Sequence, residues 1–312
     1  MKKLLLLLLC VPLIGMGQFT TIPDANFEQA LINLGYDTGT PNGSVPTSSI
    51  DTVTSLDVIS LNISDLTGIE DFTNLTYLEV SGNPLGNIDI SNNIYLTHLF
   101  CRDNDLSEID LSQNIYLYEV NLHQNNLTSL DVSTNLDLEL FAFDDNQITT
   151  IDLSNNINLG ALGAQSNLLS SLDVSNNYGL WSLYCWDNNI TSLDLRNNNW
   201  LNYLNCENNK LTDLDIRNGS NYQILEFQVL DNFDLYCINV DDSSWSGNNW
   251  TIDLWQYFSE NCSSTTSIQE YTSNKKIQKV TDILGRESDK KRDTILFYIY
   301  KDGTVEKKII IE

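Results

Sequence analysis

Seven aspartates recur in this chain at an unbroken spacing of 21 residues. Carboxylates stacked on neighbouring strands would lie about 4.8 Å apart and would repel by roughly 1 kcal/mol per pair in water. Either hydrogen-bond donors from turn amides, Ser and Asn side chains or divalent cations, chiefly Ca²⁺, must offset this repulsion. The sequence has no EF-hand loop and no glycine-rich calcium nonapeptide, so we expect hydrogen bonds and no metal. The column, which remains the alternative calcium site, comprises Asp89, Asp110, Asp131, Asp152, Asp173, Asp194 and Asp215.

Other catalytic patterns are missing from the sequence. GxSxG, HExxH, P-loop, GxGxxG and paired CxxC motifs do not occur in a usable context. His98 and His123 fall in different positions of the pattern without a nearby Cys or Ser nucleophile, and we expect both to be surface residues. Two carboxylates can act as acid and base, but a repeated column is a regularity rather than one special pair. We therefore expect no catalytic residue, no enzyme activity and no cofactor.

The elements that position the aspartates are internal repeats. Each begins with a leucine, has an Asn eight residues later, and reads LxxLxxxxNxLxxLDLSxNxx. Each unit predicts one coil whose apolar residues face a shared interior and whose Asn satisfies backbone groups at a turn. A preceding unit, residues 53–74, is one residue longer, has Leu61 in place of the Asn, and predicts an atypical first repeat. The seven repeats start at Leu75, Leu96, Leu117, Leu138, Leu159, Leu180 and Leu201.

This pattern resembles the leucine-rich repeat over roughly residues 53–240. The resemblance implies an α/β, β-rich solenoid of about eight coils of 21–22 residues with parallel strands. Twenty-one residues leave little room for a convex helix, so we expect the LDLS segment to form a short second strand or a 3₁₀ turn. We place the repeats at residues 53–221, between an N-terminal cap at 18–52 and a C-terminal cap at 222–262.

Residues that alternate with the inward ones of the main strand vary from coil to coil, which shows that the fold does not dictate them. Exposed aromatic residues on a rigid sheet are common interface hot spots, so Tyr184, Trp186 and Tyr203 form the best candidate anchor. The alternative is that these rings pack on one another. Small or apolar neighbours at Leu140, Ala142 and Ala161, with Gly163, would form a flat patch that admits a partner. The candidate ligand-binding set is Tyr184, Trp186, Tyr203, Phe100, Arg102, Leu140, Ala142 and Ala161.

The caps and cysteines give further expectations. An amphipathic helix with Asp24 as N-cap and Gly35 as its stop would cover the first coil. In an exported protein, Cys237 and Cys262, which bracket a Trp-rich segment, are expected to form a disulfide. Cys185 and Cys206 occupy one apolar column on adjacent coils, where in-register strands give poor disulfide geometry, so we expect buried thiols. Both caps resemble those of exported leucine-rich repeat proteins of Bacteroidetes bacteria.

The two ends of the chain suggest export. Residues 1–17 have the basic, apolar and small-residue regions of a signal peptide, and their apolar run is shorter than a membrane span requires. Residues 18–262 hold 34 acidic and four basic residues, a net charge of −30, whereas residues 263–312 hold ten basic and eight acidic ones. After a linker at 263–280, residues 281–312 predict a small β-hairpin with an Asp302–Gly303 turn. This ending is similar to C-terminal sorting regions of type IX secretion cargo in Bacteroidetes, which implies contact with secretion machinery; an ordinary β-appendage is the alternative.

These features limit the function classes. The acidic solenoid argues against nucleic-acid binding, which requires clustered Lys and Arg, and the mature chain shows no transmembrane segment. The resemblance implies a noncatalytic module, secreted or on the outer cell surface, that binds an unknown protein or peptide through its variable face. The alternative is a glycan or matrix adhesin, with calcium as an optional aid, and a purely structural role in the cell coat is a weaker third reading.

Overall fold

The computed structural model describes residues 18–262, 277–281, 286, 295–300 and 305–309. The chain divides into two compact units, residues 1–262 and 263–312, at the point where the sequence changes from strongly acidic to weakly basic. Each unit is described by itself below. The expected signal peptide, residues 1–17, lies outside the described residues.

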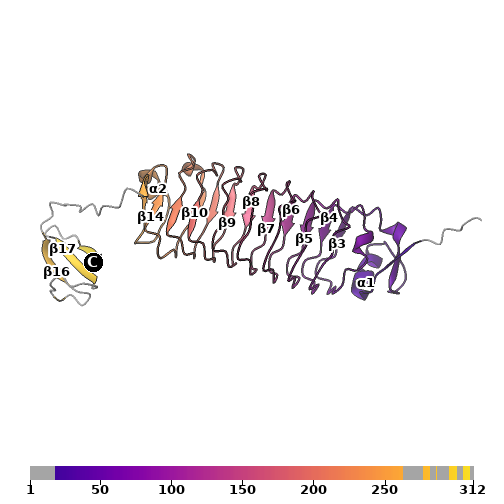
Figure 1. Ribbon diagram of the computed structural model, residues 1–312. Coiled ribbons are helices and arrows are strands. Elements are labelled where there is room, and N and C mark those ends of the chain that lie inside the picture. The colour runs from indigo at the N-terminus through magenta and orange to yellow at the C-terminus, as the bar shows by residue number, and fades with distance from the viewer. Residues whose placement is uncertain (1–17, 263–276, 282–285, 287–294, 301–304, 310–312) are drawn as a thin grey trace, which may run out of the picture. The chain divides into compact units, whose positions relative to one another are not determined.

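The first unit is a solenoid built on a parallel sheet of nine strands, each three residues long (Figure 1). Neighbouring strands pair in register one coil apart, so that Leu140 lies beside Ala161 and Phe141 beside Leu162. The predicted β-rich leucine-rich repeat architecture is therefore confirmed. The strands, in sheet order, are β3 (Ser55–Asp57), β4 (Tyr77–Glu79), β5 (His98–Phe100), β6 (Glu119–Asn121), β7 (Leu140–Ala142), β8 (Ala161–Gly163), β9 (Ser182–Tyr184), β11 (Tyr203–Asn205) and β13 (Glu226–Gln228).

A ladder of buried asparagines joins most coils to the one before them; Asn104, whose side chain donates to the Arg102 carbonyl of its own coil, is the exception. The Asn146 Oδ1 atom accepts the Leu127 amide at 2.9 Å, and its Nδ2 donates to the Leu122 and Phe143 carbonyls at 3.0 and 2.9 Å. Asn83 extends the ladder to the atypical first repeat, where its Oδ1 accepts the amides of Leu61 and Ile63. The predicted role of this column is confirmed. The same arrangement recurs at Asn125, Asn167, Asn188 and Asn209.

A second Asn ladder follows the LDLS segments on the other side of the coils. The Asn156 Nδ2 donates to the Asn135 and Val132 carbonyls of the preceding coil at 2.8 and 3.0 Å. This Asn belongs to the repeat unit read from the sequence, but only the first ladder was assigned a role there. The fully buried members are Asn93, Asn114, Asn135, Asn156, Asn177 and Asn198.

The solenoid is one coil longer than predicted. The segment from Leu201 to Ile224 contains two extra residues, which include part of the 3₁₀ helix η3 (Asn221–Gln223), and β13 then resumes the main sheet. The expected second strand in the LDLS segment appears only in the last coils, as β10 (Ser192–Asp194) and β12 (Asp213–Asp215). Together with β14 (Cys237–Asn239) and β15 (Tyr257–Ser259), these two strands form a separate parallel sheet of four strands, in the order β10, β12, β14, β15.

The N-terminal cap is the predicted helix together with a two-stranded antiparallel sheet. Helix α1 (Ala25–Asn33) starts at Asp24, whose carboxylate accepts two amides of the first turn, and the strands β1 (Phe19–Thr21) and β2 (Ser44–Pro46) pair antiparallel. The carboxylate of Glu28, which is buried, accepts the amides of Asn42 and Gly43. Phe27 stacks on Phe72 of the first coil, so the cap closes the apolar interior. The 3₁₀ helices η1 (Thr47–Ser49) and η2 (Ile69–Asp71) complete this end.

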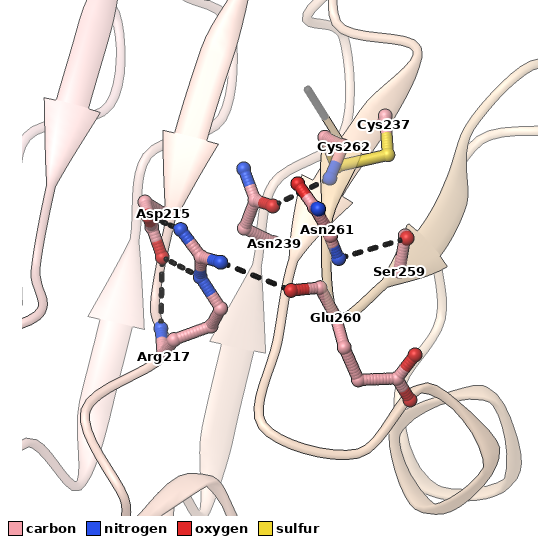
Figure 2. The surroundings of a disulfide bond; sticks show 8 residues. All are labelled: Asp215, Arg217, Cys237, Asn239, Ser259, Glu260, Asn261 and Cys262. Atoms are coloured by element: carbon pink, nitrogen blue, oxygen red, sulfur yellow. Dashed lines mark hydrogen bonds and ion pairs between the residues drawn. A yellow bond between two sulfur atoms is a disulfide. The ribbon is translucent and has the colours of Figure 1, made fainter. Parts of the chain in front are cut away.

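The C-terminal cap carries the predicted disulfide between Cys237 and Cys262, with Cα atoms 5.7 Å apart (Figure 2). Cys262 donates its amide to Asn239 Oδ1 at 2.8 Å, and Arg217 donates to the Glu260 carbonyl at 3.0 Å (Figure 2). Between the cysteines, helix α2 (Ser243–Asn249) leads to Trp250, which stacks on Phe227 of β13. The disulfide and this stack hold the last strands over the open end of the solenoid.

The second unit contains a three-stranded antiparallel sheet. The predicted hairpin is formed by β17 (Ile295–Tyr300) and β18 (Val305–Ile309), and its turn at residues 301–304 lies outside the described residues. A third strand, β16 (Ile277–Thr281), pairs with β17, and all of it except Thr281 lies in the predicted linker, residues 263–280. Within the described parts of the chain, no helix is long and apolar enough to cross a bilayer.

Candidate functional site

The variable face of the main sheet is hollowed over β7, β8 and β9. The hollow has a volume of about 250 Å³. It forms because Ala142, Ala161 and Gly163 have short side chains or none at positions where most other coils have larger residues. Tyr184 borders one side and Glu119 the other. The sequence-predicted small-residue patch therefore lines a real depression, which we call the face hollow.

A second, larger depression adjoins it at the edge where the strands begin. It has a volume of about 670 Å³ and is lined by Tyr116, Tyr118, Trp181 and the carboxylates Asp137 and Glu139, among others. Gly160, which precedes β8, lines this depression. Because Gly160 has no side chain, the Trp181 indole can lie against it; a Cβ on Gly160 would be 2.8 Å from Trp181 Nε1. Tyr118 bonds to Glu139, which raises the pKa of its phenol. We call this depression the edge groove.

The edge groove was not predicted from the sequence, and only one of its lining residues, Ile157, belongs to a column of exposed apolar residues. Two residues before each repeat leucine, five successive coils carry a large apolar residue, and all are 42–58% exposed. Because these side chains are exposed, they do not belong to the buried core of the solenoid. The variable positions of the strands do not include this column, so the predicted ligand-binding set omits it. Its members are Ile94, Ile115, Leu136, Ile157 and Tyr178.

The predicted aromatic anchor is arranged differently from the expectation. Tyr203 packs edge-on against Trp181, with ring centroids 6.2 Å apart, and the Tyr184 hydroxyl donates to Glu226 Oε2 at 3.1 Å. Among the ring contacts of the described solenoid, none joins Trp186 to either tyrosine. The three rings therefore do not form one cluster, and Tyr184 alone of them lines the face hollow.

The remaining predicted ligand-binding residues lie apart from the hollow. Phe100 on β5 contacts Tyr77, with ring centroids 5.5 Å apart, and the exposed Arg102 follows the same strand. Two strands separate β5 from the floor at β8. The structure thus brings together Leu140, Ala142, Ala161 and Tyr184, but not the other four members of the predicted set.

The aspartate column makes the hydrogen bonds expected of it. Asp131 Oδ1 accepts the Ser133 amide at 2.9 Å, and the same bond to the residue two positions on recurs at each of the seven aspartates. The serine bonds lower the pKa of Asp89, Asp110, Asp131 and Asp152 below the usual value. At the C-terminal end, Arg196 pairs with Asp194 and reaches Asp215, which also pairs with Arg217.

The two histidines have different surroundings. His98 lies between Tyr77 and Tyr118, and its Nδ1 shares a hydrogen bond of 2.9 Å with Thr97. His123 is only partly exposed: 25% of its side chain is accessible to solvent, and its Nδ1 contacts Asp144. Burial raises the pKa of Asp144, and the nearby His123 opposes that rise.

Among the described residues, the three cysteines outside the disulfide, Cys101, Cys185 and Cys206, are buried, as predicted. Burial raises the pKa of Cys185 to about 12 and also raises the pKa of Cys101 and Cys206. A thiol is nucleophilic and binds metal only as thiolate. These residues therefore act as small apolar core residues.

Comparisons with known proteins agree with this architecture. No family model matches the chain, and no curated protein matches it. Among solved structures, the functional domain of InlJ from Listeria monocytogenes is 27% identical, with a TM-score of 0.53. The fold is that of a leucine-rich repeat protein. The match covers 72% of this chain and 66% of the InlJ domain.

Two further leucine-rich repeat structures show the same fold. Internalin C2 from Listeria monocytogenes is 20% identical with a TM-score of 0.58, and the match covers 71% of this chain and 97% of that one. A leucine-rich repeat protein from Leptospira interrogans is 22% identical with a TM-score of 0.54, over 59% of this chain and 50% of that one.

Proposed function

We propose that this leucine-rich repeat protein is a noncatalytic recognition module that binds a protein or peptide across β7, β8 and β9. The observation that carries the proposal is the loss of side-chain bulk in one coil, at Gly160, Ala161 and Gly163, which hollows an otherwise regular sheet. The stability of the solenoid does not explain these small residues, because small residues on an exposed strand contribute little to stability.

The dimensions and charge of this surface favour a basic, extended segment. From β6 to β9 the floor spans three strand spacings, roughly 14 Å, which accommodates one extended chain with its side chains. Glu119 borders the face hollow, and Asp137 and Glu139 border the edge groove. A Lys or Arg of the partner would meet these carboxylates and the faces of Tyr116 and Tyr118, where a cation also gains from the aromatic rings.

Selection of a random peptide display library on the full chain tests this proposal. We expect the selected peptides to be enriched in Lys and Arg, and their binding to weaken with salt because the attraction is electrostatic. Ala161→Trp fills the hollow and should abolish binding. Ser133→Trp, at an exposed position outside both depressions, is the matched control and should leave binding intact.

Two results would contradict the proposal. Peptides that bind wild type and Ala161→Trp equally would place recognition elsewhere on the molecule. Selection of acidic or uncharged peptides alone would remove the role assigned to the carboxylates. Circular dichroism of each variant establishes that the solenoid is folded before binding is compared.

A glycan or matrix adhesin is the second candidate, and the edge groove favours it. Tyr116, Tyr118 and Trp181 offer aromatic faces for sugar rings, while Asp137 and Glu139 can accept hydrogen bonds from hydroxyl groups. Quenching of tryptophan fluorescence by soluble glycans, lost in Trp181→Ala but kept in Trp200→Ala, would support this candidate. Peptide binding that free sugars do not affect would favour the first.

We also propose that the protein is exported and acts outside the cell or on its outer surface. The signal-peptide pattern at residues 1–17 supports export, and the resemblance of residues 281–312 to type IX sorting regions of Bacteroidetes supports passage across an outer membrane. Fusions of a reporter to the full chain and to residues 1–262 test the second point. Equal surface delivery of both would make the C-terminal unit an ordinary appendage.

A further inference from the structure

Three side chains of the types that can ligate a metal ion meet on the variable face, where the strands β6 and β7 end. His123, Asp144 and Asp145 each offer one ligand atom, and all three atoms lie within 4.8 Å of one another. His123 Nδ1 contacts Asp144 Oδ2 and lies 3.4 Å from Asp145 Oδ2. Elsewhere in the described part of the chain, no other such group of three is found.

The repeat backbone holds this triad in place. His123 and Asp144 occupy the same position of successive coils, and the Gln124 amide donates to the Asp144 carbonyl at 2.9 Å. Asp145 has a left-handed backbone conformation, φ 53°, and its amide donates to the Gln165 carbonyl at 3.1 Å. The corresponding residue before each ladder Asn is left-handed in every coil from Asp103 to Asp231. The triad is thus positioned by the regular fold and requires no loop to move.

A buried oxygen next to the triad is available as a further ligand. The side-chain oxygen of Gln165, in the next coil of the same column, is buried and accepts no hydrogen bond. This Oε1 atom and Asp144 Oδ1 each lie 3.5 Å from the point where Gly163 would carry a Cβ, so the two oxygens are at most twice that distance apart. A buried acceptor without a donor is costly, and a metal ion or its bound water would satisfy it.

We propose that His123, Asp144 and Asp145 bind one divalent transition-metal ion of the Zn²⁺ type, with Gln165 Oε1 as a further oxygen donor to the ion or its water. One imidazole with carboxylates suits Zn²⁺ and its neighbours in the first transition row, whereas Ca²⁺ and Mg²⁺ take oxygen ligands. The free cysteines of the described solenoid, Cys101, Cys185 and Cys206, are buried in the core and offer no thiolate to this site.

The position gives the ion a use at the recognition surface. The three side chains are 25%, 13% and 49% exposed, so three protein ligands would leave coordination positions open to solvent. Gly163, whose Cβ position lies beside Asp144, lines the face hollow. A carboxylate or imidazole of a bound partner could therefore complete the coordination. The metal site itself does not depend on the proposed function.

Isothermal titration of the untagged, chelator-treated full chain with ZnCl₂ tests the proposal. We expect one saturable site that millimolar Mg²⁺ does not displace. His123→Ala and Asp144→Asn should each weaken binding by about tenfold or more. His98→Ala and Asp187→Asn are matched controls: His98 lies on the same face outside the triad, and Asp187 has the repeat position of Asp145 but bonds to Asn208. Both controls should bind as wild type does.

Titration with Co²⁺ gives a readout on the wild-type chain that does not depend on the folding of a variant. Coordination by nitrogen and oxygen ligands should give weak visible absorption bands without an intense thiolate charge-transfer band in the near ultraviolet. The proposal is overturned if His123→Ala retains wild-type affinity, if a thiolate band appears, or if Mg²⁺ displaces the bound metal at equal concentration. The last result would mean diffuse attraction of cations to the acidic surface.

Discussion

The side-chain oxygen of Asn146 accepts a hydrogen bond from the Leu127 amide of the preceding coil at 2.9 Å. The side-chain Nδ2 of Asn146 donates to the carbonyls of Leu122 and Phe143, so one buried side chain satisfies backbone groups of two coils. The same bonds at Asn125, Asn167, Asn188 and Asn209 couple neighbouring repeats in the same way. In a solenoid, stability depends largely on such interfaces between neighbours.

Replacing a ladder Asn should be strongly destabilising. Asn146→Ala leaves buried backbone groups without partners, and we expect a loss of roughly 2 to 4 kcal/mol in the free energy of unfolding. Asn155→Ala, at an exposed Asn whose side chain makes a single bond to the Ser133 carbonyl, should cost less than about 0.5 kcal/mol. Urea unfolding followed by circular dichroism measures both. Equal effects would show that the ladder has no special energetic role.

Most of the fold could be predicted because the sequence repeats. The leucine of Leu159 and the asparagine of Asn146 recur in seven successive coils, so the internal alignment separates core and ladder positions from variable ones. The predicted number of coils was one too low, because two extra residues before Ile224 interrupt the 21-residue spacing although the next coil still stacks on the sheet. The disulfide could be predicted because only Cys237 and Cys262 lie outside the apolar column and the expected signal peptide.

The candidate sites were harder to predict, for identifiable reasons. Tyr203 was expected beside Trp186, but its contact is Trp181, a residue outside the alternating strand positions. The triad joins His123 to Asp144 one coil away, which the columns do show, and to Asp145, which depends on the left-handed turn. Columns predict which residues are neighbours between coils, whereas turn geometry decides which side chains converge.

Removing the disulfide should loosen the C-terminal cap. The bond closes a segment with a sequence separation of 25, and a loop of this size contributes about 3 kcal/mol in the chain-entropy model. We expect Cys237→Ser with Cys262→Ser to lower stability by about that amount and to alter the fluorescence of Trp250, which stacks on Phe227. Cys185→Ala, which removes a thiol that forms no disulfide, is the control and should leave the cap signal unchanged. An unchanged cap signal in the double variant would contradict the clamping role.

Gly68 should tolerate no side chain. It has φ +103°, and a Cβ there would lie 2.3 Å from Ile22 Cδ1 and 2.7 Å from the Thr21 carbonyl oxygen. Backbone strain and overpacking together predict a loss of roughly 2 to 5 kcal/mol for Gly68→Ala. Gly86 also has a positive φ but no atom within 4 Å of its Cβ position, so Gly86→Ala should cost only about 1 to 2 kcal/mol. Thermal melts of the two variants compare the cost of backbone strain with and without the clash. Equal losses of stability would show that the clash contributes nothing.

Calcium should not stabilise the aspartate column. The carboxylates already accept amides from their own turns, and within the described residues they do not converge as a group of three ligands. A ligand that binds only the folded state raises the melting temperature by mass action. We expect millimolar Ca²⁺ to shift the melting temperature no more than Mg²⁺ at matched ionic strength. A calcium-specific rise of several degrees would favour the adhesin hypothesis.

The same column should stabilise the solenoid in a pH-dependent way. Serine bonds hold the pKa of Asp110, Asp131 and Asp152 below the usual 3.8. A carboxyl group whose pKa is lower in the folded state stabilises that state above the unfolded pKa, and this contribution is lost as the pH falls through the folded pKa. Relieved repulsion among the other acidic residues acts in the opposite direction, so a comparison between variants is needed.

Three proteins provide that comparison: wild type and the triple replacements of these aspartates by Asn or by Ala. Asn keeps an oxygen that can accept the serine amide but lacks the charge, so we expect its urea midpoint at pH 6 to lie between those of wild type and the Ala variant. The difference between wild type and the Ala variant should shrink when the pH is lowered to 2.5, because the carboxylates then become protonated. If that difference is the same at both pH values, the ionised carboxylates contribute nothing beyond a neutral acceptor, and the lowered pKa values have no energetic consequence.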